Sequence, residues 1–276
     1  MTRLPLEGIR VLDLSMVLAG PHLTKTLVDA GAEVIRIESI QRPDSIRRLW
    51  YAENDPGENW WERGLYVIKR GRGKYGITLN LAKPDGVAIF KRMVPLADVV
   101  VENYSPRVMK NFGLDYPVLK HLNPGIIMLS LSGFGQSGPW ANWTAYGWML
   151  EFVSGVTTIT GYEDSPPRKI GFPYTDPWAG VFGASAILMA LRYRNRTGKG
   201  QYIDLSQCDV GTGLISDGLM DCVMNGRVWG RTGNRHPSMA PHGCYRCKGH
   251  DDWVVLSVGS DEEWEGLGKA LGDPPW

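Results

Sequence analysis

The sequence predicts an α/β protein: an open, parallel, Rossmann-like sheet with flanking helices, followed by the beginning of a smaller α/β domain. Through the first half of the 276 residues, short β-branched runs alternate with longer amphipathic stretches. This alternation and its spacing are typical of parallel βαβ units with right-handed crossovers. Because ligands bind such sheets beyond the carboxyl ends of the strands, we expect a site in the loops after residues 14, 38, 102 and 131.

Local patterns predict the elements in order. A strand at residues 9–14 is followed by a helix at 20–30, which Gly31 ends, and by a second strand at 33–38. Pro84 begins the next helix, because the first helical residue needs no N–H partner. Further strands and helices are expected at residues 98–102, 116–121, 126–131, 202–206, 209–224, 253–258 and 261–271.

Three segments make up the predicted domain organisation. Residues 1–205 form a large α/β domain, residues 206–230 a helical linker, and residues 231–276 the start of a small domain. Because no closing element follows the last predicted helix, we expect a truncated small domain.

Composition excludes several classes of protein. Lys and Arg number 30 against 29 Asp and Glu, a formal net charge of +1, which argues against dedicated nucleic-acid or membrane-surface binding. The N-terminus lacks the apolar core of a secretory signal, and no apolar run is long enough to span a bilayer. Four cysteines in a chain of this length do not indicate a disulfide scaffold. We therefore expect a cytoplasmic protein.

Asp176 is the most informative single residue. It precedes Pro177 and a long run of small and apolar residues that stops near Gly198, which predicts a helix with Asp176 as its N-cap and Pro177 as its first residue. The positive field of the helix N-terminus would keep this carboxylate ionised. A cap, worth about 1 kcal/mol, accounts for Asp176 without any catalytic role.

Two motifs have ordinary explanations. Residues 133–138 match G-x-G-x-x-G after a strand, but Pro139 and Trp140 follow instead of a helix, so we expect no nicotinamide cofactor. Cys244 and Cys247 have the spacing of a metal half-site, but without a second pair we interpret them as incidental thiols and expect no metal.

A basic, glycine-rich stretch at residues 63–74 has two interpretations. It could neutralise a polyphosphate, or it could be a solvated loop. Its basic residues are Arg63, Lys69, Arg70, Arg72 and Lys74.

Six segments, taken in order, resemble the class III CoA transferase family, the formyl-CoA/carnitine-CoA transferase-like or CaiB/BaiF family. They include SGFGQSGP at residues 132–139 and RTGKGQ at 196–201. The other four lie at residues 11–21, 31–38, 74–80 and 98–106.

The resemblance implies a chemistry for Asp176, which lies where the family carries its nucleophile. Such an enzyme transfers coenzyme A from an acyl-CoA thioester to a carboxylic acid. The carboxylate forms an aspartyl anhydride and then an aspartyl-CoA thioester. The resemblance also implies an interlocked homodimer.

The implied CoA contacts are spread along the chain. Val17 and Leu18 lie in the loop that touches CoA in relatives, and Leu18 replaces the acyl-side Gln of formyl-CoA transferase. Asn103 and Tyr104 match the pair that lines the nucleotide. The remaining expected contacts are basic: Arg42, Arg72, Lys74, Arg107 and Lys110.

Backbone N–H groups are expected to stabilise the oxyanions of the reaction. Gly243 is the first candidate donor, and the loop with Gly133 and Gly135 is the second.

Two alternatives stay open. An α-methylacyl-CoA racemase shares the fold and the aligned Asp but needs a His where this chain has Tyr146. A truncated CoA-binding subunit without catalysis is the other. The acyl group is open too, since the aromatic side chains near Asp176 suit either an apolar pocket or core packing.

Overall fold

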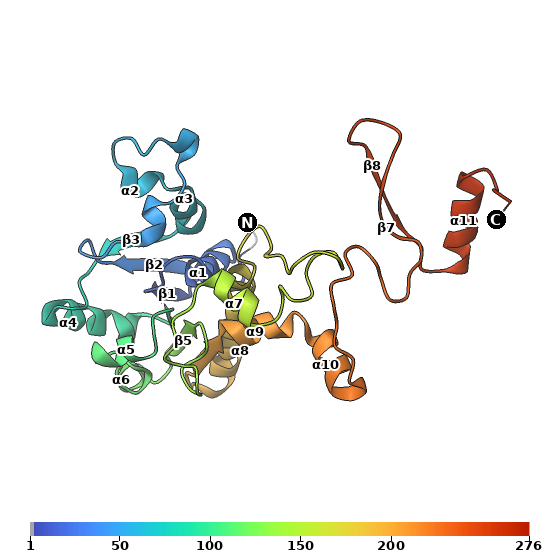
Figure 1. The fold of residues 1–276 in the computed structure, drawn as a ribbon. Helices are drawn as coiled ribbons and strands as arrows, with labels where there is room; N and C mark the ends of the chain where they lie inside the picture. The colour runs from blue at the N-terminus through green and yellow to red at the C-terminus, as the bar shows by residue number, and fades with distance from the viewer. Residues whose placement is uncertain (1–2, 276) are drawn as a thin grey trace. The chain divides into compact units, whose positions relative to one another are not determined.

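A six-stranded parallel sheet forms the core of the larger part of the chain in the computed structural model, which describes residues 3–275 (Figure 1). The strand order is β3-β2-β1-β4-β5-β6, and every neighbouring pair is parallel. This order is that of doubly wound dinucleotide-binding folds and confirms the predicted open sheet. The strands are β1 (Arg10–Asp13), β2 (Glu33–Glu38), β3 (Tyr75–Thr78), β4 (Val99–Glu102), β5 (Ile127–Ser132) and β6 (Tyr202–Ser206).

Helices cover both faces of the sheet. Successive strand residues point to opposite faces, and those on each face are largely apolar. In β4, Val99 and Val101 pack with α1 and α8, whereas Val100 packs on the opposite side with α4, α5 and α6. The helices of this region are α1 (Ala19–Asp29), α2 (Trp60–Arg63), α3 (Leu65–Gly71), α4 (Pro84–Met93), α5 (Arg107–Asn111), α6 (Tyr116–Leu122), α7 (Gly147–Val153), α8 (Thr175–Thr197) and α9 (Gln207–Gly213).

Helix α8 packs closely against α1. A Cβ at Gly183 would lie 2.3 Å from Leu23 Cδ1, so only glycine permits this approach. The C-terminus of α8 is capped by Gly198 at φ 73°, as the sequence predicts. This packing fixes the N-terminal turn of α8 at the edge where the strands end.

The chain divides into two units. The first comprises Met1–Gly155 and Gly171–Ser216, and the second comprises Val156–Ile170 and Asp217–Trp276. These boundaries differ from the expected ones, because residues 206–216 belong to the first unit and 156–170 to the second. The continuous helix expected at 209–224 is two helices, α9 and α10 (Ser216–Asn225).

The second unit contains an antiparallel hairpin of β7 (His242–Arg246) and β8 (Trp253–Ser257), followed by α11 (Asp261–Ala270). Ser260 caps α11 by accepting a hydrogen bond from the Glu263 N–H. Across residues 3–275, no helix is both long and apolar enough to cross a membrane.

Candidate active site

Asp176 lies in the first turn of α8, two positions further into the helix than predicted. The N-cap is Tyr174, so Thr175 is the first helical residue and Pro177 the third. The prediction that Asp176 is the N-cap was wrong. Pro177 fits at the third position because no N–H of the first turn has an intrahelical acceptor. The hydroxyl of Thr175 donates to the Gly147 carbonyl at 2.9 Å and fixes this start.

The two carboxylate oxygens of Asp176 have different surroundings. Oδ1 accepts a hydrogen bond of 2.7 Å from Nε2 of Gln207, the first residue of α9. Oδ2 lies against Gly147, where a Cβ would be only 2.2 Å away. The side chain is buried, with the residue 8% exposed. Glycine at position 147 is therefore a condition for this carboxylate position.

Burial raises the pKa of Asp176 to about 6. The hydrogen bond from Gln207 and the positive charge of Arg70 lower this pKa, and the negative charge of Glu151 raises it. Burial therefore outweighs the stabilisation that the sequence predicts from the helix N-terminus. Near neutral pH the carboxylate is still largely ionised and is poorly hydrated, which suits a nucleophile.

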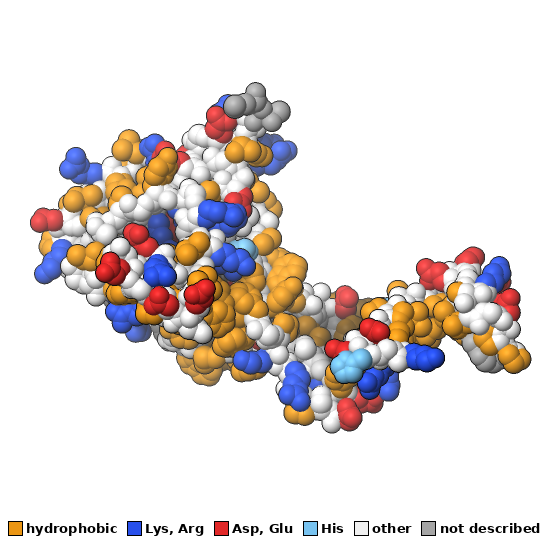
Figure 2. All heavy atoms as spheres, turned by 90° about the horizontal axis from the view of Figure 1, so that it is seen from above, with side chains coloured by type: hydrophobic (Ala, Val, Ile, Leu, Met, Phe, Trp, Pro, Cys, Tyr) orange, Lys and Arg blue, Asp and Glu red, His pale blue; other side chains and the backbone are white. Residues whose placement is uncertain are grey.

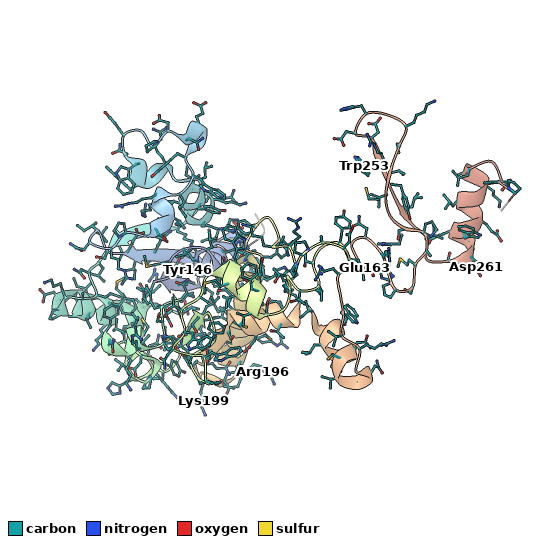
Figure 3. All side chains as sticks on the ribbon, in the orientation of Figure 1. Tyr146, Glu163, Arg196, Lys199, Trp253 and Asp261 are labelled. Carbon is teal, nitrogen blue, oxygen red and sulfur yellow. The ribbon has the colours of Figure 1, made fainter. Side chains whose placement is uncertain are left out.

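Asp176 lines a pocket of about 410 Å³ that is mostly apolar. The pocket brings together four predicted site residues, Val17, Leu18, Asn103 and Asp176. Tyr146, labelled in Figure 3, lies in this wall just before α7. The other lining residues are Ala19, Leu49, Trp50, Tyr66, Ala145, Gly147, Trp148, Gly171, Phe172, Pro173 and Gln207.

The loop after β1 forms one side of this pocket and has a strained backbone. Val17 has φ 66°, a conformation that β-branched residues rarely adopt. Its N–H donates to the buried carboxylate of Asp44 at 3.0 and 3.1 Å. Asn103 exchanges two 2.7 Å hydrogen bonds with the Met16 backbone. The amide of Asn103 thus ties the loops after β1 and β4 together at the point where the strand order reverses.

Lys74 does not lie on a ligand surface, in contrast to the prediction. Its side chain is 1% exposed and pairs with Asp13, the last residue of β1, at 3.0 Å. Its ammonium also donates to Thr24 Oγ1 at 2.6 Å and to the Pro21 carbonyl at 3.0 Å. Three acceptors match the three protons of the ammonium. Lys74 is therefore an internal cation that joins β1, α1 and the start of β3.

The basic stretch at residues 63–74 is not the solvated loop that one interpretation of the sequence expected. It contains α3, and the guanidinium of Arg70 is buried against the His22 imidazole. Burial lowers the pKa of His22 to about 4, so His22 is neutral and accepts from Arg70. Arg72 remains exposed and pairs loosely with Asp29 at 3.7 Å.

Three of the other predicted basic residues are exposed near the ends of β2 and β4. Arg42 follows β2, and Arg107 and Lys110 lie on α5. The phenol ring of Tyr104 packs against the core between the sheet and α4–α6. Burial and the negative charges of Glu102 and Asp13 raise the pKa of Tyr104, and the charge of Arg42 opposes that rise.

Of the predicted oxyanion donors, Gly133 and Gly135 do not line the Asp176 pocket. The Gly133 carbonyl accepts from Cys208 N–H at 2.9 Å, and Gly135 has φ 80° in the turn after β5. The next N–H, of Gln136, donates to Asp204 at 2.9 Å. Gly243 lies in β7 of the second unit and lines a separate, polar pocket there.

Gln207 and Tyr66 line the Asp176 pocket and were not predicted from the sequence, which named Arg70 only as a member of the basic stretch. Gln207 had a usable signal, because it directly follows the strand 202–206 and all parallel strands end at the same edge. Tyr66 and Arg70 are four residues apart on α3, which is the spacing of one helix face. The glycines around them concealed that helix.

No metal centre is formed by the residues described: nowhere in 3–275 do three His, Cys, Asp or Glu side chains gather as a group able to hold an ion. The four cysteines are free thiols, and only Cys208 is buried.

Comparison with known proteins decides the family. The profile described as "CoA-transferase family III" matches residues 6–276. The chain belongs to CoA-transferase family III. Its sequence is 38% identical to a succinate–glutarate CoA-transferase of Agrobacterium fabrum, over 97% of this chain and 66% of that protein. It is also 38% identical to an acetyl-CoA:oxalate CoA-transferase of Acetobacter aceti, over 98% of this chain and 67% of that protein.

The fold of this family III member also matches solved structures. A CaiB/BaiF family protein from Brucella suis superposes with a TM-score of 0.86 and 35% identity, covering 99% of this chain and 71% of that one. The chain spans about two-thirds of the length of the curated relatives named above.

Proposed function

We propose that this protein transfers coenzyme A from an acyl-CoA to a carboxylic acid, with Asp176 as the nucleophile. The observation that carries the proposal is a buried carboxylate, with a pKa raised to about 6, in the wall of an apolar pocket. Oδ2 attacks the thioester carbonyl, giving an aspartyl anhydride and CoA thiolate. The thiolate attacks Cγ, the free acid leaves, and an aspartyl-CoA thioester remains; an incoming acid reverses both steps.

The surroundings of the pocket support CoA as the carrier. Crevices at the reversal of strand order bind nucleotide-containing ligands in doubly wound sheets, and this pocket includes the loop after β1 and Asn103 after β4. Exposed Arg42, Arg107 and Lys110 are suited to the phosphates. Relatives named for succinate, glutarate and oxalate make short dicarboxylates the first acids to test.

Trapping tests the proposal directly. The protein is incubated with succinyl-CoA, quenched with borohydride or hydroxylamine, and digested for mass spectrometry. We expect modification of Asp176 in the native chain and none in Asp176→Asn, with CoA transfer reduced at least 10³-fold in that variant. Modification of another carboxylate in an active preparation would contradict the assignment.

We further propose that the protein acts as a homodimer. Apolar side chains are widely exposed on the surface (Figure 2). In α8 they include Phe182, at 47% exposure, and Met189, at 67%, on the side away from α1. Monomeric proteins rarely leave large apolar surfaces uncovered.

A further inference from the structure

The amide of Gln207 is built into the Asp176 site. Its residue is 6% exposed, and its Nε2 lies 2.7 Å from Asp176 Oδ1. Because a carboxylate can only accept hydrogen bonds, the amide nitrogen must be the group that faces Oδ1. The same nitrogen lies 3.4 Å from the Thr175 hydroxyl, which in turn donates to Gly147. The donor therefore contacts Oδ1 of the nucleophile, and not the Oδ2 that lies against Gly147.

Backbone contacts of α9 hold Gln207 in place. The Ser206 hydroxyl caps α9 by accepting from Asp209 N–H at 3.2 Å. The next residue, Cys208, donates its N–H to the Gly133 carbonyl at 2.9 Å. Gln207 thus sits between a capped helix turn and the end of β6, so its side chain starts from a fixed backbone.

In the proposed reaction, negative charge develops on the carbonyl oxygens of two different carbons. Each of these oxygens requires its own hydrogen-bond donor. In the first step the charge develops on the carbonyl oxygen of the substrate. In the second, CoA thiolate attacks Asp176 Cγ. The electron pair of the Cγ carbonyl moves onto its oxygen, and then returns as the bond to the bridging oxygen breaks. The leaving acid carries that bridging oxygen away.

The geometry decides which oxygen carries the charge in the second step. Oδ1 already accepts from Gln207, whereas Oδ2 lies against Gly147, a residue of the pocket lining, so we assign Oδ2 to the bridge of the anhydride. Oδ1 remains the carbonyl oxygen, within the 2.7–3.1 Å range of an oxyanion donor. We propose that the Gln207 amide is the oxyanion donor for the tetrahedral intermediates at Asp176 Cγ, through which the aspartyl-CoA thioester forms and breaks down. This inference rests on the proposed function.

A neutral donor suits this position. The hydrogen bond strengthens as the anhydride carbonyl becomes an oxyanion, which accelerates the second step. The same bond also stabilises the free carboxylate, so it gives no advantage to the first attack. Removing the amide should therefore slow formation of aspartyl-CoA far more than it slows formation of the anhydride.

The test compares the native chain with Gln207→Leu, which keeps the volume and lacks the donor. Thr212→Val is the matched control, because it removes a hydroxyl on α9 that bonds Cys208 and not Gln207 or Asp176. Each protein is mixed with succinyl-CoA without an acceptor acid and quenched at successive times. Intact-mass spectrometry distinguishes the two adducts, because the aspartyl-CoA thioester adds the mass of CoA and the anhydride adds only that of the succinyl group.

We expect Gln207→Leu to form the CoA adduct about 100-fold more slowly than the native chain, while the anhydride accumulates and CoA affinity is unchanged. Thr212→Val should behave as the native chain does. An adduct formed at the native rate by Gln207→Leu overturns the role of Gln207. A native chain without any adduct at Asp176 overturns the proposed function instead.

The pH profile provides a second readout that a purely structural role would not change. Charged and titratable groups that act on Asp176 are Arg70 and Tyr66 from α3 and Glu151 from α7. All of them remain in Gln207→Leu, so loss of the donor should move the acid limb of the rate to higher pH. If Gln207→Leu fails to fold, Gln207→Glu replaces it. The rate at which its anhydride becomes the CoA adduct should rise toward acid pH, where a protonated Glu donates again, and a conversion rate independent of pH overturns the proposal.

Discussion

At the scale of single residues, the site depends on a charge that the fold holds out of water. The pKa of Asp176 is raised from its ordinary value of 3.8 to about 6, chiefly by burial. Between these values the folded protein keeps a proton that the unfolded chain has released. The free energy of unfolding therefore falls as pH rises through this range. Above pH 6 the destabilisation by the buried, ionised carboxylate is complete, at most about 3 kcal/mol.

Asp176→Asn should therefore stabilise the protein while abolishing CoA transfer. We expect a gain of about 1–3 kcal/mol in the free energy of unfolding at pH 7.5, shrinking as the pH falls toward 3.8. Urea unfolding at several pH values measures this difference. A gain that is the same at pH 4 and pH 7.5 would show that ionisation of Asp176 is not its cause.

Gly147→Ala should damage the site by steric contact. The added Cβ would meet Asp176 Oδ2 at 2.2 Å and Pro173 at 2.6 Å, so the carboxylate must move. We expect about 1–3 kcal/mol of destabilisation and at least a hundredfold loss of transfer rate. The control is Gly213→Ala at the end of α9, where an added Cβ meets nothing within 4 Å. Equal losses in both variants would count against the steric argument.

At the scale of elements, buried charges join the strands to the helices around the site. Asp13 ends β1 and accepts from Lys74, Thr24 and Ser15. Neighbouring charges outweigh burial and lower the pKa of Asp13. Asp44 in the same way bonds both Arg36 and the strained Val17 N–H. The loop that lines the pocket is thus held by groups that do not line the pocket themselves.

Lys74→Met should destabilise the fold, because it leaves Asp13 as an unpaired buried charge. We expect a loss of about 3–5 kcal/mol, and the double variant with Asp13→Asn should lose less than the two single variants together. The control Lys25→Met breaks a more exposed pair with Asp29 and should cost under about 1 kcal/mol. Weaker CoA binding in Lys74→Met at unchanged stability would instead support a ligand contact.

At the scale of the whole molecule, α8 leaves an apolar surface exposed to solvent. The helix is apolar around much of its circumference, although only the side that packs on α1 and the sheet is buried. Its exposed residues include Val181, Phe182, Leu188 and Met189. A second copy of the chain is the partner that we propose for this surface.

Disruption of this surface tests the dimer. The double variant Phe182→Asp with Met189→Asp should convert a native dimer to a monomer, measured by sedimentation at micromolar concentration. Ile89→Asp on α4 makes the same type of change at another exposed apolar position and should leave the mass unchanged. A native chain that is already monomeric would contradict the homodimer.

The sequence alone determined the parallel α/β class, most element positions and the choice of Asp176 as the candidate nucleophile, because these depend on periodicity, on local caps and on ordered motifs. It could not reveal that Lys74 points inward or that Gln207 meets Asp176. Those facts depend on pairs 61 and 31 residues apart in the chain. Only the tertiary structure decided them, because burial and hydrogen bonding between distant segments arise when the strands assemble. The tertiary structure also placed Asp176 in the first turn of α8, where the sequence had predicted an N-cap, and its burial there raises the pKa of its carboxyl group.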